Sequence, residues 1–97
     1  MKTINTITDL FELLGNLEVC KKHGLQRIGV FGSFARQEKF NDIDLYIEED
    51  LSYAEAMEIK SVLEKETGIV FDIMLGRFAE PVILHRAIKD MKYATFN

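Results

Sequence analysis

Three aspartates are the residues of this sequence best suited to chemistry, and two of them lie one residue apart. Asp42 and Asp44 belong to DIDLYIEE (42–49), where apolar and polar residues alternate with the period of a half-buried strand. Residues i and i+2 of a strand share one face, about 6.6 Å apart, and two unit charges roughly 6 Å apart repel by about 3 kcal/mol at an effective dielectric of 20. A divalent ion that prefers oxygen ligands removes this repulsion, and Mg²⁺ is the natural candidate. The alternative is that both carboxylates lie on the solvated face of an edge strand.

The third aspartate, Asp72, lies in VFDIML (70–75), between the apolar residues Phe71 and Ile73. An aspartate in an apolar strand needs a partner or a ligand unless its side chain faces solvent. With a third carboxylate, a two-metal phosphoryl-transfer site becomes feasible, in which one ion activates an attacking hydroxyl and both ions clamp the phosphorus. The solvent-facing position of Asp72 remains the alternative.

A turn suited to phosphate precedes the paired aspartates. Gly32 and Ser33 follow the short apolar strand expected at 28–31 and open a short helix. Glycine permits a tight turn and close approach of a ligand, and the serine hydroxyl and backbone N–H lie at the positive end of that helix. Arg36 suits an oxyanion because of its guanidinium, although it could equally pair with an acid such as Glu48. An ordinary turn with Ser33 as a plain N-cap is the alternative.

Helices are expected around these strands. The first follows a cap at Thr8 or Asp9 and continues to Gly24, and the second begins at the N-cap Ser52, where Glu55 completes a capping box. Gly68 ends the second helix, and the last helix starts near Pro81 and has extended final residues.

The expected order is α-β-α-β-α-β-α, with strands at 28–31, 42–49 and 69–75 and a short helix at 33–40. This order predicts an α/β (α+β) fold, in which a three-stranded or slightly larger mixed sheet is flanked by helices. A chain of 97 residues argues for one domain over 1–97.

The charge, the cysteine count and the distribution of apolar residues exclude several classes of function. The net charge is −4, so an extensive nucleic-acid surface is not expected. Cys20 is the one cysteine, which excludes a disulfide framework and a multi-cysteine zinc site. No apolar run approaches the ~18 residues needed to span a membrane, and the N-terminus lacks an apolar signal core. The expected setting is cytoplasmic, and a homo-oligomer is left open.

Taken together, the motifs resemble a known family. Gly32-Ser33, Ala35-Arg36 and Asp42-Ile43-Asp44-Leu45 are similar to the G-S-x-A-R-G…S-D-I-D-L signature of the minimal nucleotidyltransferases, which belong to the DNA polymerase beta-like nucleotidyltransferase superfamily. The similarity covers most of the chain, since VFDIML stands where the family carries its third aspartate. The composite motif is fairly specific, whereas each part alone is not.

The resemblance implies a Mg²⁺-dependent enzyme with two ions, which moves a nucleoside monophosphate, usually AMP from ATP, to an acceptor hydroxyl. Gly32, Ser33 and Arg36 would bind the nucleotide. Asp42, Asp44 and Asp72 would be the catalytic, metal-binding residues. Such proteins are often antitoxins that attach AMP to a small helical HEPN-domain toxin, so a partner of that type is also implied.

Two residues depart from the family pattern. Gln37 replaces the second glycine of the signature, and Asn41 replaces the serine before the paired aspartates. If the glycine serves a positive φ, Gln37 would tighten or block the loop, whereas Asn41 tolerates turn conformations. The alternative function is therefore a catalytically weak nucleotide-binding antitoxin or interaction module that acts by complex formation.

Overall fold

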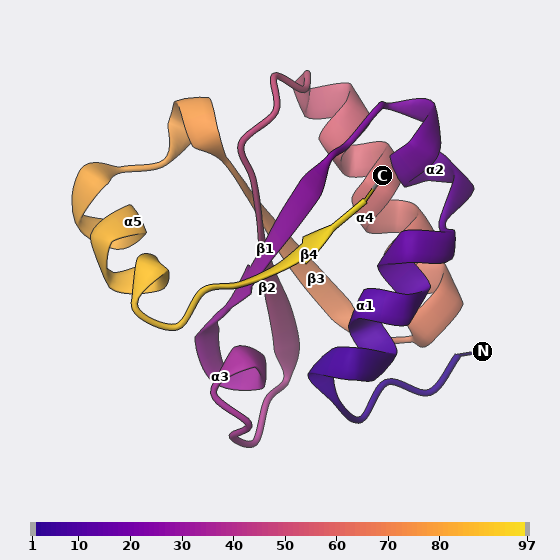
Figure 1. Ribbon diagram of the computed structural model, residues 1–97, viewed down its shortest axis with the longest axis horizontal. Coiled ribbons are helices and arrows are strands. Elements are labelled where there is room, and N and C mark those ends of the chain that lie inside the picture. The colour runs from indigo at the N-terminus through magenta and orange to yellow at the C-terminus, as the bar shows by residue number, and fades with distance from the viewer. Residues whose placement is uncertain (1, 97) are drawn as a thin grey trace.

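A mixed four-stranded sheet runs through the computed structural model, which describes residues 2–96 (Figure 1). The strands are β1 (Arg27–Phe31), β2 (Asp42–Ile47), β3 (Val70–Leu75) and β4 (Lys92–Thr95), arranged in the order β3-β2-β1-β4. β1 is antiparallel to both β2 and β4, whereas β2 and β3 are parallel. The expected α/β fold with a mixed sheet is confirmed.

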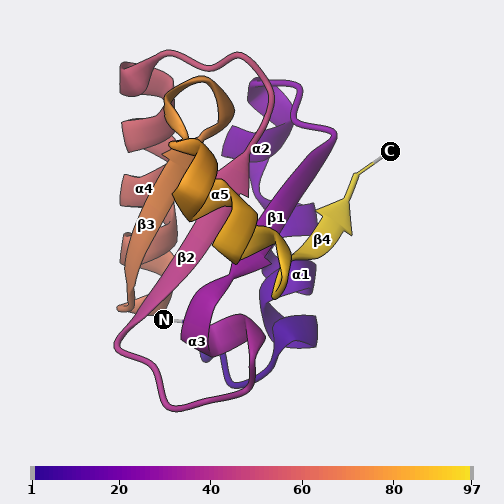
Figure 2. The same ribbon diagram turned by 90° about the vertical axis from the view of Figure 1, so that its left-hand side faces the viewer.

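Helices cover the two faces of this sheet unequally. The longer helices α1 (Ile7–Asn16) and α4 (Tyr53–Thr67) lie on one face together with the short α2 (Glu18–Lys22), and α5 (Pro81–Ile88) crosses the opposite face (Figure 2). The four-residue α3 (Gly32–Ala35) follows β1 directly, and a 3-10 turn, η1 (Gly76–Phe78), follows β3. Residues 2–96 include no helix long and apolar enough to cross a membrane.

The period-2 pattern of β2 places its apolar and acidic side chains on opposite faces. Ile43, Leu45 and Ile47 are fully buried, and they pack in one hydrophobic core with residues of α1 and α4. Asp42 and Asp44 therefore project from the other face of the strand, the face that α5 crosses. Burial of the apolar side chains fixes this register, because a one-residue slip would bury the carboxylates instead.

The N-terminal helix begins and ends differently from the prediction. Its N-cap is Thr6 rather than Thr8 or Asp9, because Asp9 is the third helical residue and closes a capping box with Thr6. The helix also breaks at Leu17, whose backbone is extended. Gly15 and Asn16 are weak helix formers at this point, and the Asn16 side chain donates a hydrogen bond to the Glu12 carbonyl in the last turn of α1.

The later caps are confirmed. Ser52 and Glu55 form the expected capping box, and Gly68 ends α4 in the left-handed conformation. Pro81 occupies the first turn of α5. The expected order α-β-α-β-α-β-α gains one strand at its end, since α5 stops at Ile88 and the extended tail pairs with β1 as β4.

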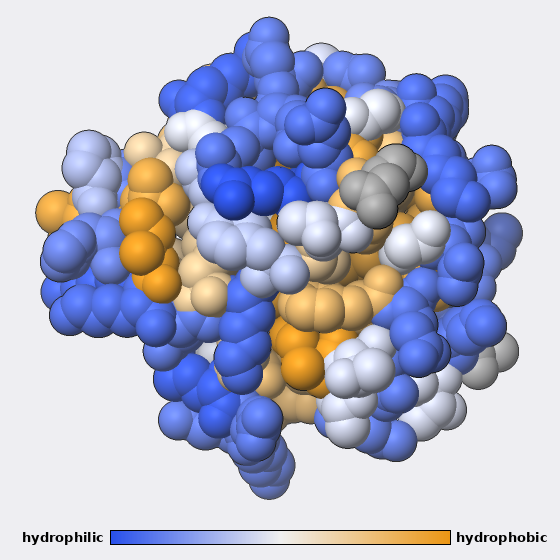
Figure 3. All heavy atoms as spheres, in the orientation of Figure 1, coloured by the Kyte–Doolittle hydropathy of each residue, from blue (hydrophilic) through white to orange (hydrophobic). Residues whose placement is uncertain are grey.

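The outward side of α5 is apolar. Val82, Ile83 and Ile88 are between 49% and 64% exposed, and Phe78 of η1 is 67% exposed. Figure 3 shows hydrophobic atoms at this side of the molecule. The opposite side of α5 packs inward through Ala87, which is buried.

Candidate active site

The sheet brings the three predicted aspartates together. In the parallel pairing of β2 with β3, Asp44 lies directly opposite Asp72, and Asp42 is two residues before Asp44 on the same face. In the antiparallel pairing with β1, Asp44 lies opposite Phe31, the residue before Gly32. The end of β1, the start of β2 and the middle of β3 therefore bring these residues together.

The carboxylates of Asp42, Asp44 and Asp72 each offer an oxygen, and these three oxygens lie within 4.8 Å of one another. Asp42 and Asp44 are partly buried, and Asp72 is exposed. Three carboxylates this close repel each other strongly, and hard divalent cations favour such a set of oxygen ligands. The group can hold a metal ion, and the donor set fits Mg²⁺ rather than a soft transition metal.

The pKa values of Asp44 and Asp72 are raised in this cluster. Burial raises the pKa of Asp44, and the charges of Asp42 and Asp72 raise it further, while Arg36 opposes the shift. Burial also raises the pKa of Asp72, followed by the effect of the Asp42 carboxyl beside it. Repulsion from the neighbouring carboxylates adds to the effect of burial in both shifts, and a bound cation would relieve that repulsion.

Gly32 is the first residue of α3, directly after β1, and it faces the acidic cluster. Its φ is +79°, and a Cβ placed on it would lie 2.3 Å from Oδ2 of Asp44. The position therefore requires glycine for its backbone angle and for space. Because no side chain intervenes, the backbone of the turn and the carboxylate of Asp44 can line the same site. Ser33 follows at the first turn of α3 and is partly buried.

Arg36, the third predicted nucleotide-binding residue, caps the end of α3. Its Nε contacts Glu38 at 3.0 Å, its Nη1 contacts Asp90 at 2.8 Å and its Nη2 lies 3.5 Å from the Ser33 hydroxyl. Arg36 therefore does pair with acids, but they are Glu38 and Asp90 rather than Glu48, which pairs with Arg27 at the other end of β1.

Two long-range contacts around α3 were not predicted from the sequence. Asp90 is 54 residues from Arg36 and reaches it only because β4 returns beside β1. Lys92 likewise donates to the Ala35 carbonyl at 2.7 Å, across 57 residues. No local pattern signals either contact, whereas Glu38 could have been found as an acid two residues beyond the arginine.

Gln37, which stands where the family pattern has a second glycine, adopts a left-handed backbone conformation. Its φ is +63°, and among residues 2–96 it is the one non-glycine residue with a positive φ. The reversal is held by hydrogen bonds from the N–H of Gln37 to the Phe34 carbonyl and from the N–H of Glu38 to the Ser33 carbonyl. The Gln37 side chain is exposed.

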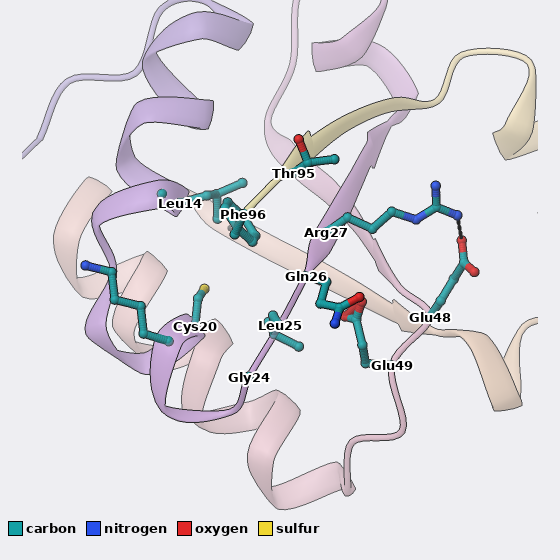
Figure 4. A pocket seen from close by; sticks show the side chains of 12 residues that line it. Leu14, Cys20, Gly24, Leu25, Gln26, Arg27, Glu48, Glu49, Thr95 and Phe96 are labelled. Carbon is teal, nitrogen blue, oxygen red and sulfur yellow. Dashed lines mark hydrogen bonds and ion pairs between the residues drawn. The ribbon is translucent and has the colours of Figure 1, made fainter.

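A separate hollow of about 1140 Å³ lies at the opposite end of β1. Figure 4 shows Arg27 paired with Glu48 at one side of it, and Cys20 beside apolar residues at the other side. Cys20 is buried, and this burial raises the pKa of its thiol to about 11. The hollow therefore contains none of the predicted site residues, and its cysteine is an inert core thiol.

Known proteins resemble the chain over most of its length. A family model described as "Nucleotidyltransferase domain" matches residues 16–96. Two curated proteins of Methanocaldococcus jannaschii are similar to it. "Putative protein adenylyltransferase MJ0435" is 30% identical over 78 residues, covering 76% of this chain and 84% of the relative. "Putative protein adenylyltransferase MJ0128" is 32% identical over 99 residues, covering 96% of this chain and 99% of the relative.

A solved structure shares the fold. The crystal structure titled as the toxin-antitoxin MntA-HpeT mutant Y104A superposes with a TM-score of 0.68 at 22% sequence identity, covering 93% of this chain and 72% of that chain. The arrangement of strands around the acidic cluster is thus that of a known fold. Since the family model spans residues 16–96 and both relatives are at least 30% identical, this chain belongs to the nucleotidyltransferase domain family and is a nucleotidyltransferase.

Proposed function

We propose that the chain transfers AMP from ATP to a hydroxyl group of an acceptor, with Mg²⁺ held by Asp42, Asp44 and Asp72. The observation that carries this proposal is the convergence of three carboxylate oxygens within 4.8 Å beside a turn that has no side chain at Gly32. Two ions bound to these carboxylates would supply charge stabilisation at the phosphorus and a more acidic acceptor hydroxyl.

Different residues of the site bind the triphosphate and accept the proton. The backbone of Gly32, the Ser33 hydroxyl and the Arg36 guanidinium bind the triphosphate and orient its α-phosphorus towards the acceptor. The acceptor oxygen forms a bond to this phosphorus, the bond to the β-phosphate oxygen breaks, and pyrophosphate leaves. Asp72, the most exposed of the three acids, takes the proton of the acceptor hydroxyl.

The test is transfer of label from α-labelled ATP in the presence of Mg²⁺, with the protein encoded next to this one as acceptor. The wild type is expected to label the acceptor, and Asp42→Asn together with Asp44→Asn is expected to abolish labelling. Asp50→Asn is the matched control, since it removes a carboxylate on the same stretch of chain that pairs with Arg77 instead. Equal labelling by the wild type and the double variant would refute the assignment of both aspartates.

We propose a HEPN-type toxin as the acceptor, with the chain acting as its antitoxin. The support is the solved structure of similar fold, whose title describes a toxin-antitoxin complex, and the names of the two relatives, which describe modification of proteins. The expected product is the toxin carrying AMP on a hydroxyl side chain. Mass spectrometry of the co-expressed pair would detect the added nucleotide and its position.

The alternative of neutralisation by contact alone is separable with the same double variant. Asp42→Asn with Asp44→Asn keeps the shape of both side chains and removes two repelling charges, so the fold and any complex should persist. A contact-only antitoxin would still neutralise its toxin in a growth assay. An enzyme would lose neutralisation while the complex remains detectable by gel filtration.

A further inference from the structure

We infer that Asp90, together with Glu38, positions the guanidinium of Arg36 for the triphosphate. This inference rests on the proposed function, because it assigns Asp90 a role in nucleotide binding at that same site. Asp90 acts through Arg36 and is therefore a positioning residue rather than a catalytic one.

The geometry assigns each nitrogen of Arg36 a different neighbour. Nε contacts Glu38 and Nη1 contacts Asp90, at 3.0 and 2.8 Å, which fixes the plane and the rotation of the guanidinium. Nη2 is thereby directed to the Ser33 hydroxyl, 3.5 Å away. The edge of the guanidinium with the weakest protein contact thus faces the phosphate-binding turn.

Arg36 belongs to the same short helix as the glycine that faces the acidic cluster. Gly32 opens α3 against Oδ2 of Asp44, and Arg36 caps the other end of that helix, with its backbone N–H donating to the Gly32 carbonyl. A triphosphate bound between the turn and the carboxylates would therefore approach the helix that carries Arg36.

The C-terminal part of the chain braces this turn at two points. Asp90 precedes β4 and contacts Arg36, and Lys92, in β4, donates to the Ala35 carbonyl at the end of α3. Pairing of Lys92 with Val30 fixes β4 against β1, so Asp90 is carried on a rigid support. The fold thereby couples the end of α5 to the phosphate-binding turn.

Removal of Asp90 has different expected effects if Asp90 positions Arg36 than if the Arg36–Asp90 pair stabilises the fold. The side chains of Arg36 and Asp90 are 40% and 29% exposed, and exposed ion pairs contribute little to folding stability. Holding a long, flexible arginine in one rotamer before the ligand arrives, however, removes an entropic cost of binding. Asp90 should therefore affect nucleotide affinity more than the melting temperature.

Charge repulsion between Asp90 and the triphosphate would lower nucleotide affinity, which is opposite to the effect of positioning. Asp90 is an anion, and a triphosphate would be repelled by it or would have to displace it from Arg36. If that effect dominated, removal of Asp90 would tighten binding. Because the 2.8 Å contact neutralises Asp90 through Nη1 and leaves Nη2 directed at Ser33, we expect positioning to exceed repulsion.

The test is calorimetry of the full chain with Mg²⁺ and a non-cleavable ATP analogue. Asp90→Ala is expected to weaken Kd by about three- to tenfold, the range given by the ordering of one long side chain. Asp90→Asn retains a hydrogen-bond acceptor and should fall between the wild type and Asp90→Ala. Asp50→Ala, which removes the carboxylate that pairs with Arg77, is the charge-matched control and should bind like the wild type.

A double-mutant cycle decides whether Asp90 works through Arg36. Arg36→Ala is expected to weaken Kd by about 10- to 100-fold, as for a charge-assisted hydrogen bond. Adding Asp90→Ala to Arg36→Ala should then have no further effect. Unchanged or tighter binding by Asp90→Ala, or the same loss in both backgrounds, overturns the inference. Absence of nucleotide binding by the wild type would instead refute the proposed function itself, and the inference with it.

Discussion

Replacing Gly32 with alanine tests the link between the turn and the acidic cluster most directly. The new Cβ would lie 2.3 Å from Oδ2 of Asp44 and 3.3 Å from its Cγ. An ordinary contact between such atoms begins at about 3.4 Å, so Asp44 or the turn must move by roughly 1 Å. A displacement of that size at a reacting group can lower the rate by about 100-fold.

The same substitution also strains the backbone. A residue with a side chain at a φ of +79° loses roughly 1–2 kcal/mol relative to glycine, and the smaller entropy of the unfolded alanine chain returns about 0.4–1 kcal/mol. The expected net loss in the free energy of unfolding is about 1 kcal/mol. For a domain of this size, that corresponds to a fall in Tm of about 4–8 °C.

The assay combines thermal unfolding with transfer of labelled AMP below the melting temperature of each variant. Gly15→Ala is the matched control, because a Cβ at Gly15 meets no atom within 4 Å and alanine favours helix by up to about 1 kcal/mol. That control should transfer AMP at the wild-type rate with an equal or higher Tm. A Gly32→Ala protein that transfers AMP within a few-fold of the wild type would refute the inference that the turn and Asp44 share one site.

Three further outcomes are expected. Gln37→Gly should raise the free energy of unfolding by about 0.5–1 kcal/mol, since glycine relieves the positive φ of +63°; thermal unfolding measures this gain, and a lower Tm would contradict it. Mg²⁺ should stabilise the wild type by about 2.7 kcal/mol at 100 times its Kd, and Asp42→Asn should lose most of this stabilisation in the same thermal scan. Burial raises the pKa of Cys20 from 9.0 to about 11, so a thiol reagent at pH 8 should modify it at least ~100-fold more slowly than an unfolded cysteine. Because unfolding then releases the thiol proton, this group makes stability fall as pH rises from 9 to about 11, which denaturation at each pH would detect.

The elements that could be predicted are those whose signals are local. The capping box of Ser52 and Glu55 lies within one turn of helix, and its hydrogen bonds do not depend on the rest of the fold. The strand with Asp42 and Asp44 was predicted because alternation along a few residues fixes which face is buried. Asp72 was recognised as an acid in an apolar strand, although only the parallel pairing places it opposite Asp44.

The features that could not be predicted depend on contacts between distant parts of the chain. The sequence predicts that the end of the C-terminal tail is extended, but not that it joins the sheet, which it does as β4 because β1 has an edge to pair with. Asp90 is positioned by that pairing, so its contact with Arg36 has no local signal. The break at Leu17 depends in part on burial of the Leu17 side chain in the core, in addition to the weak helix formers Gly15 and Asn16 before it.

The two glycine positions of the family signature therefore have different physical requirements. At Gly32, both the backbone angle and the missing side chain matter, because a Cβ would collide with Asp44. At Gln37, only the angle matters: the side chain points to solvent, and the reversal places Glu38 against Nε of Arg36. Glutamine at this position costs about 1 kcal/mol of strain and leaves the geometry of the acidic cluster intact. This departure from the signature should lower stability, and it gives no structural reason for the enzyme to be inactive.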